Sequence, residues 1–511
     1  MKNSKNKKYF PWIILLIVFI FTVLLNYYVQ WRCLDSDMAS EMVLANLLNK
    51  EGALISKNWY YSTEVRVFCE QMWLQLGLLL SPNNWRIARL IGHSINLALL
   101  IISFIFLLYS TSIKEKGVWI AVVLLLPFDF WYLFHVLYGG FYICHMIALF
   151  VMLGLLLRYI NSNKKIYLLL LFVFGIVFGL NGIKIIMYYS IPCLLMLVII
   201  TVYKYINNNK SISFYKSLAI GTCISFISAA IGVSIYLFVI CKIYTCYSPI
   251  NMTWGNININ NILLTISNYL QSLGFVNNEY FFSNTKILSI NGLLGVFGLL
   301  NAIVFVVNLV FLLKKEYFQA NKNKELFIFI ICAFISQTIV LSLTSENYNA
   351  SYWLPFIPFS LLIIEMFLET IKEFGYNIKF LRIGLLVSFA LCSFANNDYY
   401  MKDGPSRYEG MQETANWLKE RGCKKVIAEF WAGNALAEYS NGEIEVFIIN
   451  DYGNNSIYYY LQNKNHTKAP LEKDTYVVVP ECDELNRDLT YLLNNAEVVY
   501  KPSDLIVYRI K

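Results

Sequence analysis

Long apolar segments, repeated along most of the chain, constrain its fold more than any other feature. A helix that crosses a membrane needs about 20 predominantly apolar residues. Such segments occur at 10–29, 88–109, 118–134, 140–157, 166–182, 185–203, 217–241, 289–313, 326–343, 353–371 and 382–396. Hydrophobic residues make up 58 % of the 511 positions and charged residues 14 %, whereas soluble domains have roughly 45–50 % and about 25 %. The sequence therefore predicts a polytopic α-helical membrane protein of about eleven spans.

The distribution of positive charge predicts how these spans are oriented. Lysines near the N-terminus precede the first span, which is too long for a signal peptide and has no cleavage site after it. The other basic loops alternate with loops of little charge and fall on the same side as the N-terminus: Lys114/Lys116, Arg158/Lys164/Lys165, Lys204/Lys210/Lys216, Lys314/Lys315/Lys322/Lys324 and Lys372/Lys379/Arg382. The positive-inside rule makes this side cytoplasmic. The positive charges behind the net charge of +8 therefore lie where they orient the spans in the cell membrane. This distribution excludes nucleic acid as a partner.

The opposite side receives the long segments 30–87 and 242–288 and everything after residue 396. Residues 38–49 have apolar positions at helical spacing and polar ones between them, among them Ser40 and Glu41, which predicts an amphipathic helix lying in the membrane interface with these residues on its polar face. From residue 397 onward, helix and strand patterns alternate, with strands expected at 425–430, 446–449, 476–479 and 505–510, which predicts a small extracytoplasmic α/β domain over 397–511. The predicted organisation is a transmembrane domain at 1–396 followed by this domain.

The cysteines do not indicate a metal site or a disulfide framework. Eleven are scattered along the chain without C-x-x-C or C-x-x-H spacing, and most fall within apolar segments. A small buried hydrophobic residue is the expected role for a cysteine in that setting.

An acidic pair follows the first span directly. Asp35 and Asp37 are separated by one residue, so on an extended segment they would point to the same side. Paired carboxylates bind a divalent cation, or one acts as a general base while the other positions the substrate. A solvated acidic loop end is the alternative interpretation.

The same outer segment contains an aromatic and charged stretch at 58–66. Tyr60 and Tyr61 offer aromatic faces for sugar rings, or they form part of an interfacial aromatic belt. Arg66 carries a planar guanidinium that matches a phosphate, although Glu64 is close enough in sequence to neutralise it.

Further candidate site residues are polar groups near the ends of spans. Charges within a membrane are costly and are usually functional or paired, whereas snorkelling and interfacial hydrogen bonding are the alternative roles. These candidates are Asp129, His135, Lys184, Glu346 and Tyr352.

The order of these features resembles the GT-C superfamily of membrane glycosyltransferases, in particular the bacterial protein-mannosyltransferase-like and aminoarabinose-transferase-like enzymes. The resemblance covers the architecture of the whole chain, with few specific residues: Asp35, Asp37, Glu64, Arg66 and the segment 352–355. This chain departs from the pattern in having Ser351 before Tyr352, where many relatives have Arg, and Lys184 where Arg is expected.

The resemblance implies a GT-C-like fold and a sugar donor linked to polyprenyl phosphate. It implies that Asp35, or as second choice Asp37, is the catalytic general base. Arg66 and Lys184 would then bind the donor phosphate, and Glu64 would position the acceptor or a metal. Tyr60, Tyr61, Asp129, His135, Glu346 and Tyr352 are the expected substrate-binding residues. No cofactor is required by this scheme, and a divalent metal ion is left open.

Two other classes of function compete with a transferase. A transporter or flippase of lipid-linked glycans would place its ionisable residues at the membrane midplane and often has internal repeats; no repeat is evident here, and the acidic residues are in outer loops. A non-catalytic membrane scaffold would tolerate replacement of both Asp35 and Asp37. The sugar remains open, and so does the acceptor, which is an envelope glycan, a lipid or a protein.

Overall fold

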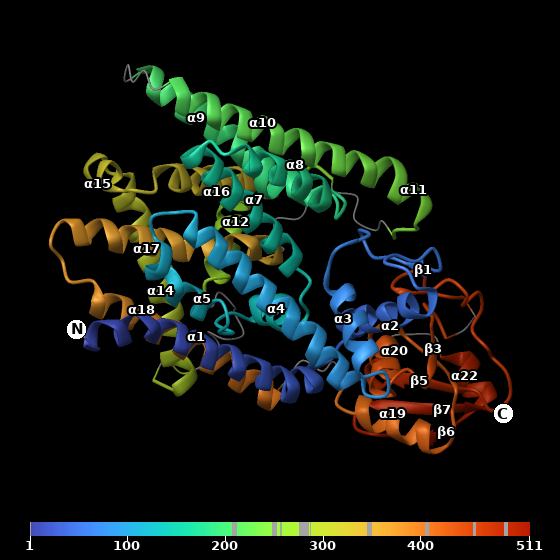
Figure 1. Cartoon of the computed structure of the whole chain (residues 1–511). Coiled ribbons are helices and arrows are strands. Elements are labelled where there is room, and N and C mark those ends of the chain that lie inside the picture. The colour runs from blue at the N-terminus through green and yellow to red at the C-terminus, as the bar shows by residue number, and fades with distance from the viewer. Residues whose placement is uncertain are drawn as a thin grey trace. The chain divides into compact units, whose positions relative to one another are not determined.

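The computed structural model describes residues 2–206, 212–247, 253–255, 258–274, 286, 288–344, 350–403, 408–452, 456–484 and 489–511. These residues form two compact units (Figure 1). Unit 1 comprises Met1–Val23, Leu97–Leu237 and Asn251–Tyr399, and unit 2 comprises Leu24–Asn96, Phe238–Ile250 and Tyr400–Lys511. Each unit is therefore assembled from three separate stretches of the sequence.

Seven helices in the described part of the chain are long and apolar enough to cross a membrane. These candidate spans are Tyr9–Tyr28, Trp85–Tyr109, Ile143–Ser162, Phe214–Ile243, Gly295–Leu313, Lys324–Leu343 and Ala350–Glu373. Two shorter apolar helices cover Lys165–Gly179 and Ile186–Val202. The predicted multi-pass helical protein is confirmed, and the number of eleven spans stays a prediction.

The helices of the apolar part follow the predicted segments closely. Their bounds are α1 Lys2–Tyr28, α4 Trp85–Tyr109, α7 Ile143–Ser162, α8 Lys165–Gly179, α9 Ile191–Ile206, α10 Ile212–Ile235, α12 Ile259–Gln271, α14 Ile290–Leu313, α15 Lys315–Ala320, α16 Lys324–Leu343, α17 Ile357–Glu373 and α18 Lys379–Asp403. Single turns of π-helix at Ile186–Ser190 and Tyr236–Ile240 lead into α9 and into the short α11, Cys241–Ile243. A 3₁₀ turn at Ala350–Phe356 precedes α17.

The predicted span 118–134 does not form one continuous helix. The chain forms α5 (Val118–Val123), then α6 (Phe130–Tyr132), and continues in a π-helical turn at Leu133–Tyr138. Pro127 lies in the interruption, where it supplies no backbone N–H for a continued helix. Asp129 then starts the new helix, because its side chain accepts a hydrogen bond from the Tyr132 amide at 3.0 Å.

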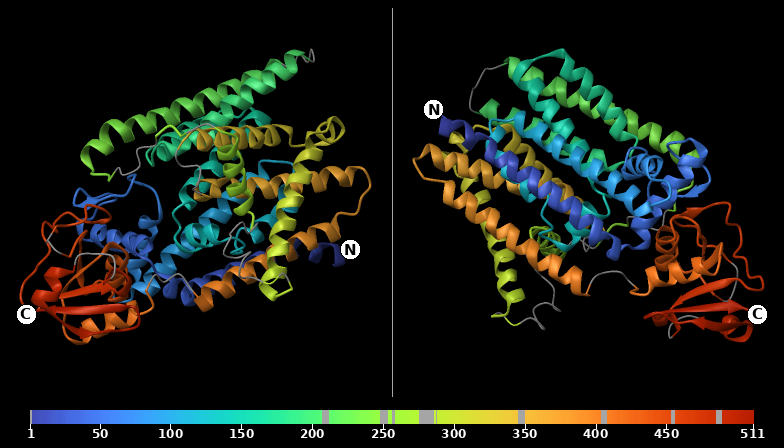
Figure 2. Two further views of the ribbon diagram at one scale, coloured as in Figure 1. Left: turned by 180° about the vertical axis from the view of Figure 1, so that it is seen from behind. Right: turned by 60° about the horizontal axis from the view of Figure 1, so that its bottom comes forward.

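Within unit 1, helices α8 and α10 lie side by side at very close range (Figure 2). A Cβ atom added at Gly232 would lie 2.3 Å from the Ile176 carbonyl oxygen, and one added at Gly179 would lie 2.7 Å from the Ala229 carbonyl oxygen. Small residues at such positions let two backbones approach, which is how helices associate in lipid.

In unit 2, the C-terminal residues form a mixed five-stranded sheet in the order β3-β2-β5-β7-β6. The strands are β2 Lys425–Ala428, β3 Glu445–Ile448, β5 Tyr476–Pro480, β6 Ala496–Tyr500 and β7 Leu505–Ile510. Strands β3, β2 and β5 are parallel, whereas β7 is antiparallel to both β5 and β6. The helices of this region are α19 Met411–Glu420, α20 Phe430–Tyr439, α21 Glu481–Glu484 and α22 Thr490–Asn495. The predicted α/β character is confirmed, and β6 is a strand that the sequence pattern did not predict.

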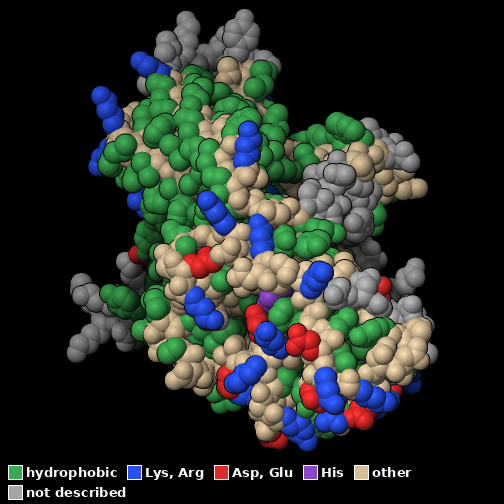
Figure 3. Space-filling view, turned by 90° about the vertical axis from the view of Figure 1, so that its right-hand side faces the viewer, with side chains coloured by type: hydrophobic (Ala, Val, Ile, Leu, Met, Phe, Trp, Pro, Cys, Tyr) green, Lys and Arg blue, Asp and Glu red, His purple; other side chains and the backbone are tan. Residues whose placement is uncertain are grey.

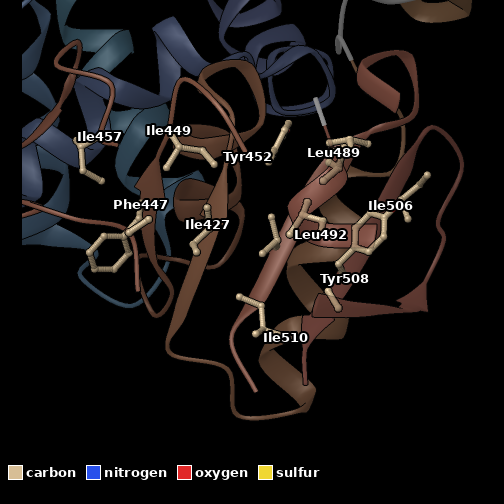
Figure 4. Packing of buried hydrophobic residues seen from close by; sticks show 14 residues of the cluster. Ile427, Phe447, Ile449, Tyr452, Ile457, Leu489, Leu492, Ile506, Tyr508 and Ile510 are labelled. Atoms are coloured by element: carbon tan, nitrogen blue, oxygen red, sulfur yellow. The ribbon is translucent and has the colours of Figure 1, made fainter. Parts of the chain in front are cut away.

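The core of this sheet shows why these segments become strands. Alternate side chains of the strands point to one face, where Ile427, Phe447 and Tyr508 are buried (Figure 4). Leu489, which precedes α22, and Leu492 of α22 pack into the same core. The opposite face receives α20, whose Gly433 allows Ile448 to approach closely. Figure 3 shows Lys and Arg side chains interspersed with Asp and Glu side chains over the lower part of the view.

Helix α2 (Ser36–Glu51) contains the predicted amphipathic segment, but its surroundings differ from the prediction. It packs against α20 and against α3 (Glu70–Leu80) within unit 2. Ser40 and Glu41, which were expected on a polar outer face, are both buried. The helix is therefore an internal element of unit 2, because protein covers it on more than one side.

Candidate functional site

Helix α2 begins at the predicted acidic pair. Asp35 is the N-cap residue, and its Oδ1 accepts a hydrogen bond from the Met38 amide at 2.9 Å. Asp37 is in the first turn of the helix and is half-buried. The prediction that the two carboxylates point to the same side of an extended segment is wrong, because residues two apart at a helix start do not face each other.

A small pocket, partly open to solvent, lies beside α2. It is formed by α2, the outer segment before α3 and one residue of the C-terminal region, and its lining residues are Ser40, Glu41, Leu44, Trp59, Tyr61, Ser62, Glu64, Arg66, Gln71 and Leu461. All of them belong to unit 2. Of the predicted site residues, the pocket brings together Tyr61, Glu64 and Arg66.

Arg66 stands between two carboxylates of this pocket. Its Nη2 lies 3.2 Å from Glu41 Oε1, and its Nε lies 3.8 Å from Glu64 Oε1. Glu41 is four residues after Asp37 and so lies on the same face of α2. Burial raises the pKa of Glu41, the charges of Glu70 and Asp37 add to this effect, and Arg66 opposes it. A buried carboxylate with a raised pKa, close to other charges, is suited to hold or transfer a proton.

Sequence reasoning named Glu41 only as part of a polar helix face. The signal that was present is its spacing of four residues from Asp37, which puts two carboxylates on one side of a helix in the same outer segment as Arg66.

The start of α2 is held in place by residues of α20. The Tyr439 hydroxyl donates to the Trp31 carbonyl at 2.6 Å, and the Asn434 amide donates to Ser36 Oγ at 3.3 Å. Deeper in the unit, the guanidinium of Arg89 pairs with both carboxylate oxygens of Glu438 at 2.5 and 2.6 Å. The C-terminal region thus contributes directly to the position of the acidic pair.

Arg89 links this ion pair to the pocket helix. Its Nη2 also donates to the Met38 carbonyl at 2.8 Å. The amide of the same residue, Met38, donates to Asp35. A second buried pair in the same unit joins Glu70 Oε1 and His93 Nδ1 at 2.6 Å. The Arg89 pair fixes the start of α2 through charged hydrogen bonds, which are stronger than neutral ones, and the second pair joins α3 to α4.

Two further predicted residues, Lys184 and His135, lie beside Tyr142 in unit 1. Lys184 Nζ is 5.5 Å from the centre of the Tyr142 ring, and the Tyr142 hydroxyl is 3.0 Å from Ser351 Oγ. The His135 ring lies with its centre 6.0 Å from that of Tyr142. Tyr142 was not predicted as a site residue, because a tyrosine at the end of an apolar segment is also typical of an interfacial belt.

Two other predicted residues of unit 1 have local structural partners. Asp129 caps α6 as described above, and the Tyr352 carbonyl accepts a hydrogen bond from Gln337 Nε2 at 3.3 Å. Glu346 lies outside the described residues. Arg66 belongs to unit 2 and Lys184 to unit 1, so their joint role in binding a phosphate stays a prediction.

Among the residues that the structure describes, no group of three or more His, Cys, Asp or Glu side chains is arranged to hold a metal ion.

Comparison with known proteins identifies the fold. No family model matches the sequence, and no curated protein matches it. Among solved structures, the chain is similar to ArnT from Cupriavidus metallidurans bound to undecaprenyl phosphate, with a TM-score of 0.57 and 12 % identity, over 96 % of this chain and 97 % of that one. The apo state of the same protein matches with a TM-score of 0.55 and 11 % identity over the same shares. The chain therefore has the fold of ArnT over nearly its whole length.

Proposed function

We propose that this chain is a membrane glycosyltransferase that moves a sugar from a polyprenyl-phosphate donor to an acceptor at the outer face of the cell membrane. The observation that carries the proposal is the likeness in fold, over 96 % of the chain, to ArnT, one structure of which is bound to undecaprenyl phosphate. The pocket at Glu41, Glu64 and Arg66, in the segment that follows the first span, supports the same function because it combines acid–base groups with a cation.

In the proposed reaction, Asp35 takes the proton of an acceptor hydroxyl, and the hydroxyl oxygen attacks the anomeric carbon of the donor sugar. The bond between that carbon and the phosphate oxygen breaks, and the lipid phosphate leaves with the electron pair. A single displacement of this kind inverts the anomeric centre. The N-terminus of α2 favours negative charge on Asp35, which is the charge state that a general base needs. Asp37 is the second candidate for this role.

Arg66 and Lys184 are the proposed partners of the departing phosphate. Positive groups aimed at the leaving oxygen stabilise the charge that develops there. Arg66 already faces Glu41 and Glu64, so a phosphate at this site competes with two carboxylates. Burial raises the pKa of Glu41, which favours its protonated form. Protonation removes one of the two negative charges that compete with a phosphate for Arg66.

The other candidate residues of the sequence are proposed substrate contacts. Glu64, Tyr60 and Tyr61 are proposed to position the acceptor and sugar in unit 2. Asp129, His135, Glu346 and Tyr352 remain proposed substrate contacts as well. A divalent metal ion stays open, and activity after treatment with a chelator tests it.

The proposal is tested in a strain that lacks the protein and is complemented with wild type, Asp35→Asn or Asp37→Asn. Polyprenyl-phosphate sugars and envelope monosaccharides are quantified by mass spectrometry. Asp474→Asn is the matched control, because Asp474 is exposed in the C-terminal region and has a left-handed backbone that asparagine tolerates. A transferase predicts that Asp35→Asn accumulates one lipid-linked sugar and loses one envelope sugar, whereas the control matches wild type.

Two other results would favour the competing functions. If both aspartate variants complement fully while the deletion has a phenotype, a scaffold explains the protein better. If the lipid-linked sugar accumulates only on the cytoplasmic side, as measured by its accessibility in intact spheroplasts, a flippase explains it better.

The proposed site requires that the segment after the first span be extracytoplasmic. The positive-inside rule supports a cytoplasmic N-terminus and an extracytoplasmic C-terminal domain. Fusions of green fluorescent protein or alkaline phosphatase to the C-terminus test this, since only the phosphatase is active outside the cytoplasm.

A further inference from the structure

Two residues that line the pocket of the candidate site each have a buried polar atom without a hydrogen-bond partner. The Trp59 and Gln71 side chains are 1 % and 2 % exposed. Among the residues that the structure describes, neither the Trp59 Nε1 donor nor the Gln71 Oε1 acceptor has a partner. Both residues line the same small pocket as Arg66. Because burying an unpaired polar atom is costly, such atoms beside a pocket indicate that a ligand or an ordered water satisfies them.

The orientation of the Gln71 amide follows from its neighbours. Its Nε2 donates to the Arg66 carbonyl and, at 3.5 Å, to the Val67 carbonyl. Carbonyl oxygens only accept hydrogen bonds, so the nitrogen of the amide has to face them and the oxygen is the end that is left over. Gln71 therefore has two functions, because it also holds the backbone of Arg66, the proposed partner of the donor phosphate.

The backbones of both residues are fixed by secondary structure. Trp59 belongs to β1 (Trp59–Tyr60), which pairs with β4 (Gln462–Asn463) in antiparallel register. Gln71 lies in the first turn of α3. A donor and an acceptor that are held in this way lose little conformational freedom when a ligand binds.

A hydroxyl group matches this pair of atoms, because it donates one hydrogen bond and also accepts. An ammonium group only donates, so it would leave Trp59 Nε1 unpaired. A carboxylate only accepts, so it would leave Gln71 Oε1 unpaired. A ring carbon without a polar substituent would leave both atoms unpaired. The pair therefore selects an uncharged hydroxyl against the other substituents that sugars carry.

We propose that Trp59 Nε1 and Gln71 Oε1 together recognise one hydroxyl of the donor sugar, which makes the donor a sugar with an uncharged hydroxyl at that ring position. This inference rests on the proposed glycosyl transfer. The donor is assigned, and not the acceptor, because Arg66 lines the same pocket and the group attached to the phosphate that it is proposed to bind is the donor sugar. Trp59 Nε1 donates to the hydroxyl oxygen, and the hydroxyl donates to Gln71 Oε1.

The test measures how much a sugar adds to the binding of a lipid phosphodiester. The probes are synthetic farnesyl phosphodiesters of glucose, mannose, galactose and arabinose, and methyl farnesyl phosphate is the reference of equal charge without a sugar. Their dissociation constants for the full-length protein in detergent are measured by isothermal titration calorimetry. We expect at least one sugar to bind more tightly than the reference. The monodeoxy analogues of that sugar then identify the hydroxyl, since one of them should bind roughly 2- to 10-fold more weakly, the range for one or two neutral hydrogen bonds.

Trp59→Phe is the decisive variant. It keeps an aromatic ring and breaks no hydrogen bond of Trp59 Nε1 to a described residue. We expect it to bind the reference as wild type does, to lose the advantage of the parent sugar roughly 2- to 10-fold, and to bind the parent sugar and the deoxy analogue equally. Trp85→Phe is the matched control, because Trp85 is also buried in unit 2 but does not line the pocket.

Gln71→Met tests the other half of the pair. It should lower the advantage of the sugar and, because Arg66 loses its backbone contact, also the affinity for the reference. Melting midpoints of all variants separate these effects from unfolding. The inference is overturned if no sugar binds more tightly than the reference, or if Trp59→Phe with an unchanged midpoint still discriminates against the deoxy analogue. Equal binding of every probe to wild type and both variants would assign the two atoms to an ordered water only and would overturn it as well.

The outcome is distinguishable from that of the proposed function. If Asp35→Asn and Asp37→Asn leave envelope sugars unchanged but Trp59→Phe abolishes the discrimination between probes, the hydroxyl site stands and the transferase does not. If Asp35→Asn abolishes transfer while Trp59→Phe affects neither probe binding nor transfer, the transferase stands and the hydroxyl site does not.

Discussion

Replacing Glu438 by glutamine is expected to destabilise unit 2 because it breaks a buried ion pair. The Arg89 and Glu438 side chains are 2 % and 0 % exposed, and two hydrogen bonds join them. Glutamine keeps the size of the side chain but leaves the Arg89 guanidinium as a buried charge without its counter-ion. The same guanidinium holds the Met38 carbonyl, so the start of α2 is disturbed as well.

The size of the effect follows from the burial of the pair. Removing one partner of a buried ion pair costs about 3–5 kcal/mol, because the other charge stays desolvated. For a domain of about 150–250 residues, the size class of unit 2, each kcal/mol lowers the melting temperature by about 2–4 °C. Glu438→Gln should therefore lower the midpoint by roughly 6–20 °C. The double variant Arg89→Met/Glu438→Leu should recover most of this loss, since it leaves no unpaired charge.

The protein contains its own reporter of unfolding. Its cysteines are free thiols, and Cys33, Cys69 and Cys423 of unit 2 are buried. A thiol-reactive fluorescent dye therefore follows the unfolding of the detergent-solubilised protein during heating, and replacing the buried Cys144, Cys193, Cys332 and Cys392 of unit 1 by alanine restricts the unfolding signal to unit 2. Glu443→Gln is the matched control, because Glu443 pairs with Lys419 at a side-chain exposure of 51 % and exposed pairs contribute about 0–1 kcal/mol. A Glu438→Gln midpoint within 2 °C of that control would refute the reasoning, taking about 2–4 °C per kcal/mol as the scale.

Three further predictions concern the same helices. The pKa of Glu41 is raised in the folded state, so its contribution to stability is fully present below the unfolded-state pKa and is lost as the pH rises through the folded-state pKa. Glu41→Gln should therefore flatten the fall of the melting midpoint above about pH 4.5. An unchanged slope would contradict this. Gly232→Ala should destabilise unit 1 by about 1–3 kcal/mol, because its Cβ meets backbone at 2.3 Å, whereas Gly384→Ala, with nothing within 4 Å, should be neutral or stabilising in the same thermal assay. Asp35→Ala should cost about 0.5–2 kcal/mol through loss of the N-cap, while Asp35→Asn keeps the cap; equal midpoints for the two variants would contradict the capping role.

The membrane character and the α/β region were predictable because they depend on patterns that repeat. Spans of about 20 apolar residues and alternation along strands survive local irregularities. Strand β6 was missed because Ala496–Tyr500 is short and only partly buried, so its hydrophobic alternation is weak. The interruption at Pro127 was missed because the residues on both sides of it are as apolar as a continuous span.

The site was predictable in its location and not in its geometry. Sequence placed acids, tyrosines and Arg66 in one outer segment, and unit 2 brings Tyr61, Glu64 and Arg66 to one pocket. The sequence did not predict that Asp35 is the N-cap of α2 while Asp37 lies in its first turn. Contacts such as Tyr60 with Tyr459 join residues about 400 positions apart, and no local pattern contains that information.

The most direct test of the central claim measures transfer itself. Lipid-linked sugars extracted from the deletion strain are incubated with an envelope extract and purified wild type or Asp35→Asn, and the release of free polyprenyl phosphate is followed by mass spectrometry. Loss of a general base lowers rates by about 10²–10⁴-fold, so wild type is expected to release the lipid phosphate while Asp35→Asn, with the same melting midpoint, is expected to be slower by a factor in that range. Equal rates for the two proteins, or no release by wild type, would contradict the account.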